Sequence, residues 1–291
     1  MEQAINVQSL AQKRRTYFKH PGSLIVFLLT WLAALLTMGV LVFLIGYILI
    51  KGVPFLTPDL FKLEYNSDNV SMLPALINTL LMTVLALLIA GPLGIFAAIY
   101  MVEYAKKGNK VVGVVRVTAE TLSGIPSIVY GLFGALFFVT FLHLRLSLIS
   151  GALTVAIMVL PTILRTTEEA LIAVPASFRE GSFGLGAGKL RTVFRIVLPS
   201  AVPGILAGVI LAVGRIVGET AALIYTAGTA PQIAGSLFDS GRTLAVHMYS
   251  LSREGLHVDQ SYATAVVLLV IVLLMNSLSS IIARKVASKN Q

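Results

Sequence analysis

The chain contains no cysteine and few charged residues, and each shortage excludes a class of protein. Without cysteine, disulfides, thiol catalysis and thiolate metal sites are all excluded. Charged residues make up 12% of the 291 residues, whereas a soluble domain has about 25%. With 57% hydrophobic residues and a mean hydropathy of +0.90, the composition is that of a polytopic membrane protein.

Six apolar runs predict transmembrane helices, because an α-helix crosses the hydrocarbon core with about 20 residues. They lie near residues 24–50, 73–101, 121–142, 147–164, 200–228 and 262–283. The first run has no charged residue, is too long for the core of a signal peptide and ends in no small-residue cleavage site, so we interpret it as retained. The predicted fold class is an all-α membrane protein with six transmembrane helices.

The lysines and arginines alternate between the two sides of these spans. The N-terminal tail (1–23), the second–third and fourth–fifth loops and the C-terminus carry four, four, five and three, against five on the opposite side. The positive-inside rule therefore predicts that both termini are cytoplasmic, and that the net charge of +9 reflects topology rather than nucleic-acid binding. Arg116 and Glu120 are spaced i,i+4 where the third span begins; a surface ion pair there would contribute little, so we interpret them as interfacial anchors.

Two outer loops, residues 51–72 and 229–261, are polar and rich in proline, glycine and serine. The second carries Asp239, His247, His257 and Asp259, which lack the tight spacing of metal ligands. We therefore expect solvated side chains and no metal site here.

Arg215 and Glu219 are two opposite charges inside the apolar fifth span. Their i,i+4 spacing would place them on one helix face within reach of an ion pair. Gly204, Gly208 and Ala212 precede them on that face, and such small residues allow close helix packing. The pair is thus expected to face protein or a water-filled path, either as a structural ion pair or as part of a substrate pathway.

The loop between the fourth and fifth spans, residues 165–199, predicts two short helices. Residues 175–185 can form the first, since proline is tolerated in the first turn of a helix. Glycines at 184, 186 and 188 then allow a tight turn before an amphipathic stretch at 190–198. Such a protrusion on the cytoplasmic surface suits docking into a groove of a soluble partner. We call residues 165–199 the coupling loop.

The spacing within this loop resembles the EAA signature of ABC-importer permeases. That signature is Glu-Ala-Ala, three residues, Gly, nine residues and Ile-x-Leu-Pro. The matching positions, with small residues in place of both alanines, are Glu180, Gly181, Ser182, Gly186, Ile196, Leu198 and Pro199. The resemblance implies that the coupling loop contacts an ATP-binding subunit.

Two further stretches are similar to motifs of phosphate-importer permeases. They are Gly-Ile-Pro-Ser-Ile-Val-Tyr-Gly-Leu-Phe at 124–133 and Arg-Ile-Val-Gly-Glu-Thr-Ala at 215–221. The resemblance spans about residues 70–285, which would be the type I ABC permease domain. Of the two similar permease types, PstA and PstC, the run Thr-Ala-Gly at 226–228 and the short chain favour PstA.

This resemblance implies a role in a larger assembly in the bacterial plasma (inner) membrane. The chain would form half of a translocation path together with a second, PstC-like permease subunit. A dimer of PstB-like ATP-binding subunits would supply the energy, and a PstS-like extracytoplasmic phosphate-binding protein would deliver the substrate. ATP and Mg²⁺ would bind to the ATPase subunits, and the chain itself would bind no cofactor and be no enzyme.

Several positions within the spans have structural interpretations beside functional ones. Pro126 predicts a kink in the third span because proline removes a helix hydrogen bond, and this kink could mark a gate or serve packing. Gly131 and Gly134 are expected at close helix contacts, and Asn78 is expected to hold helices together.

Four other functions remain as alternatives or are disfavoured. A permease for molybdate or sulfate, or a PstC-type permease, would share the coupling loop. An intramembrane enzyme would need clustered catalytic groups, whereas His143 stands alone and Glu219 has no second carboxylate nearby. A secondary transporter would have no use for a coupling loop.

The run at 184–190 is similar to a phosphate-binding loop but lacks the Ser/Thr and the first glycine of that motif, so we expect this chain not to bind ATP.

Overall fold

A computed structural model describes residues 21–106 and 108–289, and in these ranges the chain is helical throughout, without strands. The chain divides after Lys51 into two units. The first consists of helix α2 (Pro21–Gly52), which matches the predicted first span. Its apolar side chains are exposed on all sides, and Thr30 and Thr37 donate to backbone carbonyls four residues earlier, each at 2.8 Å. A helix that is apolar all round and satisfies its own hydroxyls is suited to lipid.

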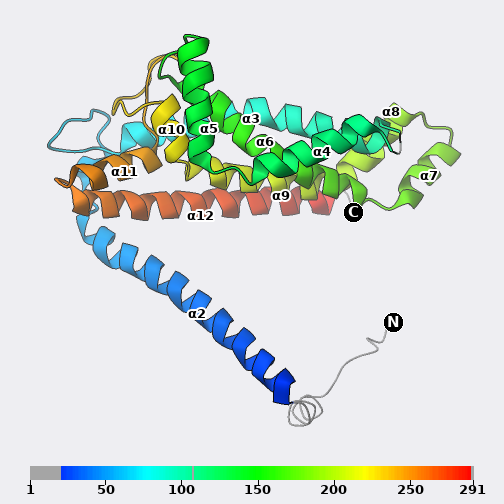
Figure 1. Ribbon diagram of the computed structural model, residues 1–291, viewed down its shortest axis with the longest axis horizontal. Coiled ribbons are helices and arrows are strands. Elements are labelled where there is room, and N and C mark those ends of the chain that lie inside the picture. Colours follow the sequence, from blue (N-terminus) through cyan, green and yellow to red (C-terminus); the bar gives the residue numbers. More distant parts are fainter. Residues whose placement is uncertain (1–20, 107, 290–291) are drawn as a thin grey trace. The chain divides into compact units, whose positions relative to one another are not determined.

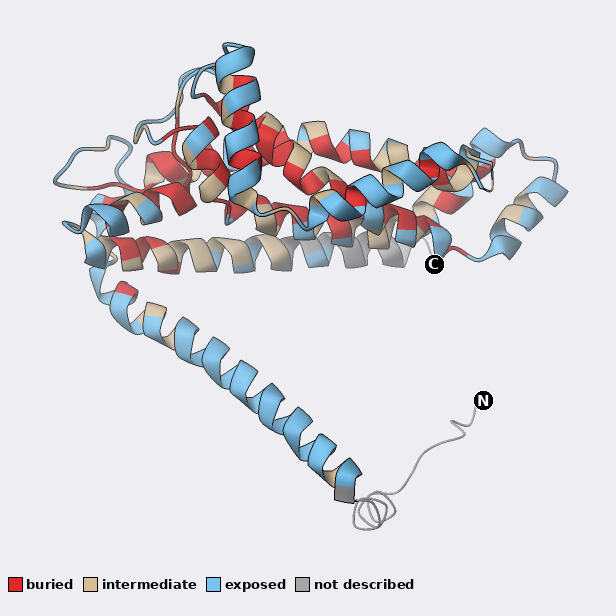
Figure 2. Cartoon of the chain, in the orientation of Figure 1, coloured by how far each residue is buried: buried red, intermediate tan, exposed pale blue. Residues whose placement is uncertain are grey.

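The second unit is built on a central group of long helices. These are α3 (Leu73–Ile99), extended by the π-helix η3 (Tyr100–Tyr104), α6 (Leu148–Ile172), α9 (Leu198–Val217) and α12 (Val258–Lys289). Helix α6 packs between α3 and α9, and α12 runs alongside α9 (Figure 1). Buried residues are concentrated on α3, α6 and α9 (Figure 2). Helix α6 corresponds to the predicted fourth span, 147–164, but is longer than predicted and extends to Ile172.

Small residues allow the central helices to approach closely. A Cβ atom on Gly204 would lie 2.6 Å from the Cβ of Ala170, and one on Gly208 would collide with Thr166. Ala212 on the same face is fully buried. The predicted packing stripe on the fifth span is therefore confirmed as far as Ala212, and its partner is α6.

The predicted third span is broken rather than kinked. Helix α4 (Lys110–Ser123) meets α5 (Ser127–Gly134) and its π-helical extension η4 (Ala135–Phe141) at 105°. Pro126 has extended backbone angles and caps α5, because its ring prevents Ile125 from continuing the helix. The bend predicted at Pro126 is confirmed and is large enough to redirect the chain. Counted as one span, the bent pair completes six candidate spans in the described ranges.

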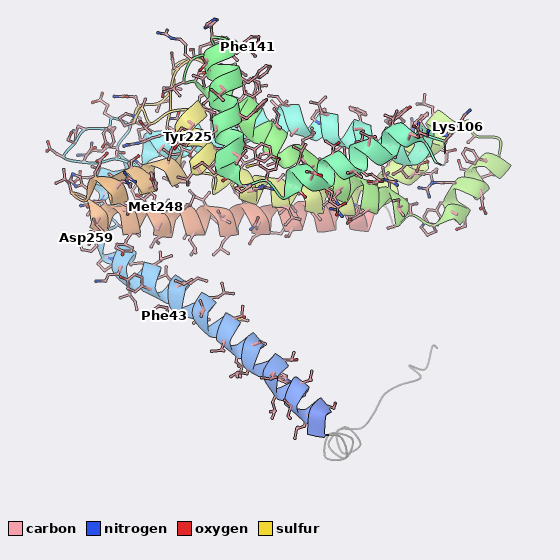
Figure 3. The ribbon with its side chains drawn as sticks, in the orientation of Figure 1. Phe43, Lys106, Phe141, Tyr225, Met248 and Asp259 are labelled. Carbon is pink, nitrogen blue, oxygen red and sulfur yellow. The ribbon has the colours of Figure 1, made fainter. Side chains whose placement is uncertain are left out.

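The loops gather at two opposite ends of the second unit. Lys106 lies at the end that carries α7 (Ala176–Gly184), whereas Met248 and Asp259 lie at the other (Figures 1 and 3). This second end contains the short helices η1 (Val53–Phe55) and η2 (Pro58–Phe61) and the helix α11 (Leu244–Glu254). The segments predicted on opposite sides of the membrane are thus separated in space.

Asn78 fastens the second outer loop to the bundle. Its Nδ2 donates to the carbonyl of Gln232 at 2.9 Å and to that of Arg242 at 3.3 Å, and its Oδ1 accepts from the Ala234 amide at 3.1 Å. The residue is fully buried. Its role is structural as predicted, but it holds a loop rather than a neighbouring helix.

Candidate functional site: the coupling loop and a pair of helix breaks

The first residues of the coupling loop, 165–172, belong to α6, and the part that leaves the bundle begins near Pro175. The residue before a proline is disfavoured in the helical region, so the chain leaves α6 and restarts as α7. Helix α7 matches the predicted short helix. Glu180 and Gly181 are exposed on it, while Ser182 is half-buried.

Gly186 ends α7 in a Schellman motif. Its amide donates to the carbonyl of Phe183 at 2.9 Å, and the amide of Ala187 donates to Ser182 at 3.1 Å. This bond pattern requires a left-handed residue at position 186, and Gly186 has a φ of +82°. The glycine of the EAA-like pattern thus fixes the turn between the two halves of the loop.

Substitution of Gly186 with alanine is expected to weaken this turn by about 1–2 kcal/mol, because a Cβ is strained at positive φ. The matched control is Gly184→Ala, at a position that has no positive φ and open space around it. In the complex that the resemblance implies, ATP hydrolysis stimulated by the binding protein should fall in G186A and remain normal in G184A. Equal activity in both variants would contradict this role of the turn.

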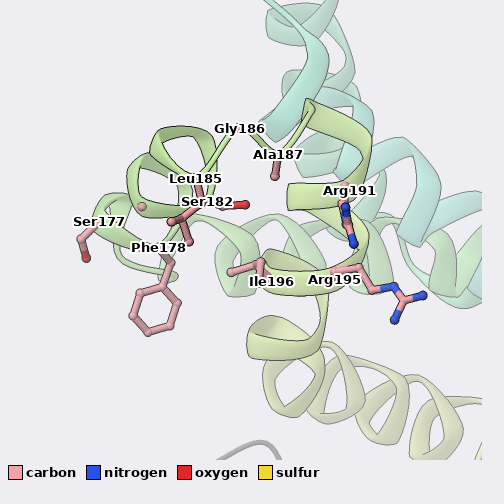
Figure 4. A pocket seen from close by; sticks show the side chains of 10 residues that line it. Ser177, Phe178, Ser182, Leu185, Gly186, Ala187, Arg191, Arg195 and Ile196 are labelled. Atoms are coloured by element: carbon pink, nitrogen blue, oxygen red, sulfur yellow. The ribbon is translucent and has the colours of Figure 1, made fainter.

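A hollow separates the two halves of the coupling loop. The second half comprises α8 (Lys189–Thr192) and the π-helix η5 (Val193–Val197), and the Oγ atoms of Ser182 and Thr192 lie 2.8 Å apart across the gap. The cavity measures about 510 Å³ and is open to solvent (Figure 4). Its lining includes Phe178 and Leu185 from the first half and Arg191, Arg195 and Ile196 from the second. Exposed apolar side chains beside arginines form a surface suited to another protein.

The last part of the EAA-like pattern anchors the loop to the bundle. Pro199 lacks an amide hydrogen, and the chain before it widens into η5, whose last bond runs from the Leu198 amide to the Val193 carbonyl. Val193 and Val197 are buried against Leu171 of α6, and Leu198 packs at the edge of the same cluster. Ile196 instead faces the hollow.

Arg116 forms an ion pair at the end of the bundle that carries the coupling loop, but its partner is not Glu120. Arg116 donates from Nε to Oε1 of Glu168 at 2.6 Å, so it joins α4 to α6 rather than pairing with Glu120 of its own helix. Glu168 is buried and Glu120 is exposed. Pairing with Arg116 provides the compensating charge that the buried carboxylate of Glu168 needs.

The fifth span is also broken, and of the two interpretations of Arg215 and Glu219 the structural ion pair is not formed among the described residues. Helix α9 ends at Val217, and a new helix, α10 (Ala221–Thr226), follows Gly218 and Thr220. Glu219 is buried and its Oε1 accepts from the Ala222 amide at 2.9 Å. The half-buried Arg215 lies in the last turn of α9, where a cation is favoured by the helix dipole. Because of the break, Arg215 lies at the C-terminal end of α9 and Glu219 bonds to the N-terminal end of α10.

The two helix breaks lie beside each other. A Cβ on Gly131 of α5 would fall 2.7 Å from the Cα of Ala222 in α10, so the two backbones are in direct contact. A Cβ on Gly134 would fall 2.7 Å from the Cγ2 atom of Thr226 and would collide with the side chain of Thr154 in α6, so both glycines are packing positions as predicted. The hydroxyl of Tyr130 donates to the Leu122 carbonyl at 2.7 Å across the first break. An apolar hollow of about 310 Å³ opens at the same place, lined by Leu122, Ile125, Val129, Tyr130, Phe133 and Ile157.

The prediction that His247 is solvated is wrong. It is fully buried at the end of the second unit that carries α11, with its ring edge-on to Tyr65 at 6.2 Å. The guanidinium of the buried Arg242 lies 4.6 Å from the same tyrosine ring. Burial first, and then the charge of Arg242, lower the pKa of His247 from 6.5 to about 3, while the backbone of Val70 opposes them. Asp239 and Asp259 are exposed and His257 is half-buried, so only His247 departs from the prediction in this way.

Neutral His247 should make the stability of the protein depend on pH. Between pH 6.5 and 3 the unfolded state binds a proton that the folded state does not, so stability is full above 6.5 and lost as pH falls. The loss should reach about 2 kcal/mol at pH 5, because pH 5 lies about 1.5 units below the ordinary pKa of 6.5 and each unit corresponds to about 1.4 kcal/mol. Thermal unfolding in detergent at pH 7 and pH 5 measures it. His247→Phe, which keeps the ring, should lower this dependence, whereas His257→Phe should leave it unchanged; equal pH dependence in the two variants would contradict the assignment.

Comparison with known proteins gives a consistent result. Residues 90–289 match the family model of the binding-protein-dependent transport system inner membrane component. The chain is 35% identical over 243 residues to the probable ABC transporter permease protein YqgI of Bacillus subtilis, covering 78% of this chain and 82% of that protein. It is 33% identical over 261 residues to the phosphate transport system permease protein PstA 2 of Mycobacterium bovis, covering 86% and 85%.

Solved structures resemble this chain in fold. A bacterial alginate ABC transporter, crystallised with an alginate-bound periplasmic protein, has a chain that matches with a TM-score of 0.64 at 14% identity, covering 96% of this chain and 99% of that one. An inward-facing MetNI methionine ABC transporter matches with a TM-score of 0.57 at 20% identity, covering 73% and 93%.

Proposed function

Because this chain belongs to the family of binding-protein-dependent transport system inner membrane components, we propose that it is the PstA-type permease subunit of an ATP-driven importer of inorganic phosphate. Curated relatives that carry the PstA name support the substrate, since one of them matches over 86% of this chain. The helical fold, with up to six candidate spans, is that of an ABC-importer permease in the membrane.

The coupling loop would bind one of two ATP-binding subunits. Helix α7 presents Phe178, Phe183 and Leu185 to solvent, and Leu185 is 91% exposed. Apolar side chains of this size on a loop are suited to a groove on a partner. In this proposal the loop faces the cytoplasm, ATP and Mg²⁺ remain on the partner, and this chain supplies no catalytic group.

The paired helix breaks would line half of the substrate path. Broken helices at membrane depth mark the binding region of many transporters, because they free backbone groups and helix ends for a ligand. Arg215 lies in the last turn of α9, just before the second helix break. It has no ion-pair partner in the described ranges, and its guanidinium carries a fork of donors that matches phosphate oxygens. Glu219 would keep α10 in place beside Arg215. The apolar hollow beside Pro126 would receive the second, PstC-like permease subunit.

The observation that supports this proposal most strongly is the match to PstA 2 of Mycobacterium bovis, which is 33% identical over 261 residues. It is tested with the purified complex of permease and ATP-binding subunits together with its extracytoplasmic binding protein. Binding protein loaded with phosphate should stimulate ATP hydrolysis, and the same protein with sulfate or molybdate should not. Stimulation by a sulfate- or molybdate-loaded binding protein alone would keep the permease assignment and overturn the substrate.

A further inference from the structure

The side chain of Arg179 joins α7 to two other helices. Its Nη2 lies 2.7 Å and its Nε 3.1 Å from Oε1 of Glu103, in the π-helix that ends α3. Nη2 also donates to the carbonyl of Leu171, and Nη1 donates to that of Val174, both at 2.8 Å. The Leu171 carbonyl lies in the last turn of α6, and that of Val174 lies two residues beyond the end of the helix. One guanidinium therefore contacts α3 and α6 at once.

This ion pair is more buried than a surface salt bridge. The side chain of Glu103 is 8% exposed and that of Arg179 is 20% exposed. In contrast, Lys62 and Asp59 form a pair in which both side chains are about three-fifths exposed (60% and 61%). An exposed pair of that kind contributes little, whereas a forked arginine–carboxylate contact has a fixed geometry. Arg179 and Glu103 thus hold α7 in one orientation.

The position of this ion pair determines how a displacement of α7 reaches the other helices. The backbone of α7 packs against α8 and η5, which follow it in the chain. Between them lies the turn at Gly186, and the glycines on either side of it have open space around them. Along the chain, α7 is therefore joined to α8 and η5 through this single turn. Arg179 instead connects α7 directly to α3 and α6, the helices that pack against α9 and its Arg215.

We propose that Arg179 and Glu103 are positioning residues for transport, and that their contact transmits the displacement of α7 to α3 and α6. The proposal rests on the assignment of the chain as an ATP-coupled permease. Arg179 contacts neither nucleotide nor phosphate in this scheme. Its loss should therefore uncouple ATP hydrolysis from transport without removing either binding site.

The coupling ratio tests this proposal. Proteoliposomes that contain the full complex are assayed for phosphate taken up per ATP hydrolysed. Arg179→Met and Glu103→Gln should each lower the ratio by about tenfold, the scale of a typical coupling between sites. The double variant should be no worse than either single variant, because both remove the same contact. Lys62→Met, which breaks the exposed pair, is the matched control and should leave the ratio unchanged.

A distance measurement provides a second readout that does not depend on phosphate. Because the chain has no cysteine, Leu185→Cys on α7 and Leu93→Cys on α3 introduce unique spin-label positions, both well exposed. The label separation should be the same in nucleotide-free and ATP-trapped complexes of the otherwise native chain. With Glu103→Gln it should differ between the two states. Glu103→Gln keeps the side-chain volume and one acceptor, so it remains informative even where Arg179→Met does not assemble.

Two results would overturn the proposal. One is an unchanged coupling ratio in both single variants. The other is a label separation that responds to nucleotide equally with and without Glu103→Gln. Failure of the native complex to import phosphate would instead contradict the substrate assignment, and the distance measurement would still decide the role of Arg179.

Discussion

Replacing Arg215 with glutamine is expected to abolish phosphate uptake while the complex still assembles. Arg215 lies at the end of α9, where its charge is half-buried and has no carboxylate partner among the described residues. Glutamine keeps much of the side-chain length but removes the charge and the fork of donors that phosphate oxygens would accept. Loss of a charged contact of this kind corresponds to about 2–5 kcal/mol, which is roughly a hundredfold or more in uptake.

Two further variants separate the charge of Arg215 from other effects. Arg253→Gln removes an exposed arginine at the opposite, outer end and should leave uptake unchanged. Glu219→Gln keeps an oxygen that can accept from the Ala222 amide, so it should retain most of the uptake. Normal uptake by Arg215→Gln would remove this residue from the substrate path. Equal loss in Glu219→Gln would indicate that the two charges act together after all.

Replacing Gly131 with leucine is expected to disrupt the contact between α5 and α10. Even a Cβ at this position would lie 2.7 Å from the Cα of Ala222, and a backbone atom cannot rotate away as a side chain can. Overpacking of this kind costs about 3 kcal/mol or more, and it would separate the two helix breaks. The thermal unfolding temperature in detergent and the uptake rate should both fall.

Gly113→Leu is the matched control for this substitution. Gly113 lies in α4, and a Cβ at this position would have no neighbouring atom within 4 Å. Leucine there should therefore change neither stability nor uptake by a comparable amount. If Gly131→Leu were as stable and as active as Gly113→Leu, the close contact between α5 and α10 would be wrong.

The long spans and the packing glycines were predictable because their signals are local. Length and apolar composition identify a spanning helix, and small residues at helical spacing identify a close contact. For the same reason the α7 helix was predicted from Pro175 and the glycines that follow it. The bend at Pro126 was also predicted, because proline acts on its own neighbours.

The break in the fifth span could not be predicted in this way. Helical spacing placed Arg215 and Glu219 together, but one glycine at 218 and the capping of α10 by Glu219 proved stronger than the continuity of the helix. The contacts of Arg179 and His247 were missed for a different reason. Glu103 is 76 residues from Arg179, and Arg242, Tyr65 and His247 come together from separate outer loops. Such contacts depend on the tertiary fold, and the sequence near each residue contains no signal for them.

The central claim is that this chain forms the path of an ATP-driven phosphate importer. Uptake of labelled phosphate into proteoliposomes that contain the full complex tests it most directly, with ATP present or absent and with sulfate and molybdate as competitors. The account predicts uptake that requires ATP and the binding protein and is blocked by unlabelled phosphate alone. ATP-independent uptake, or uptake blocked by sulfate or molybdate instead, would contradict it.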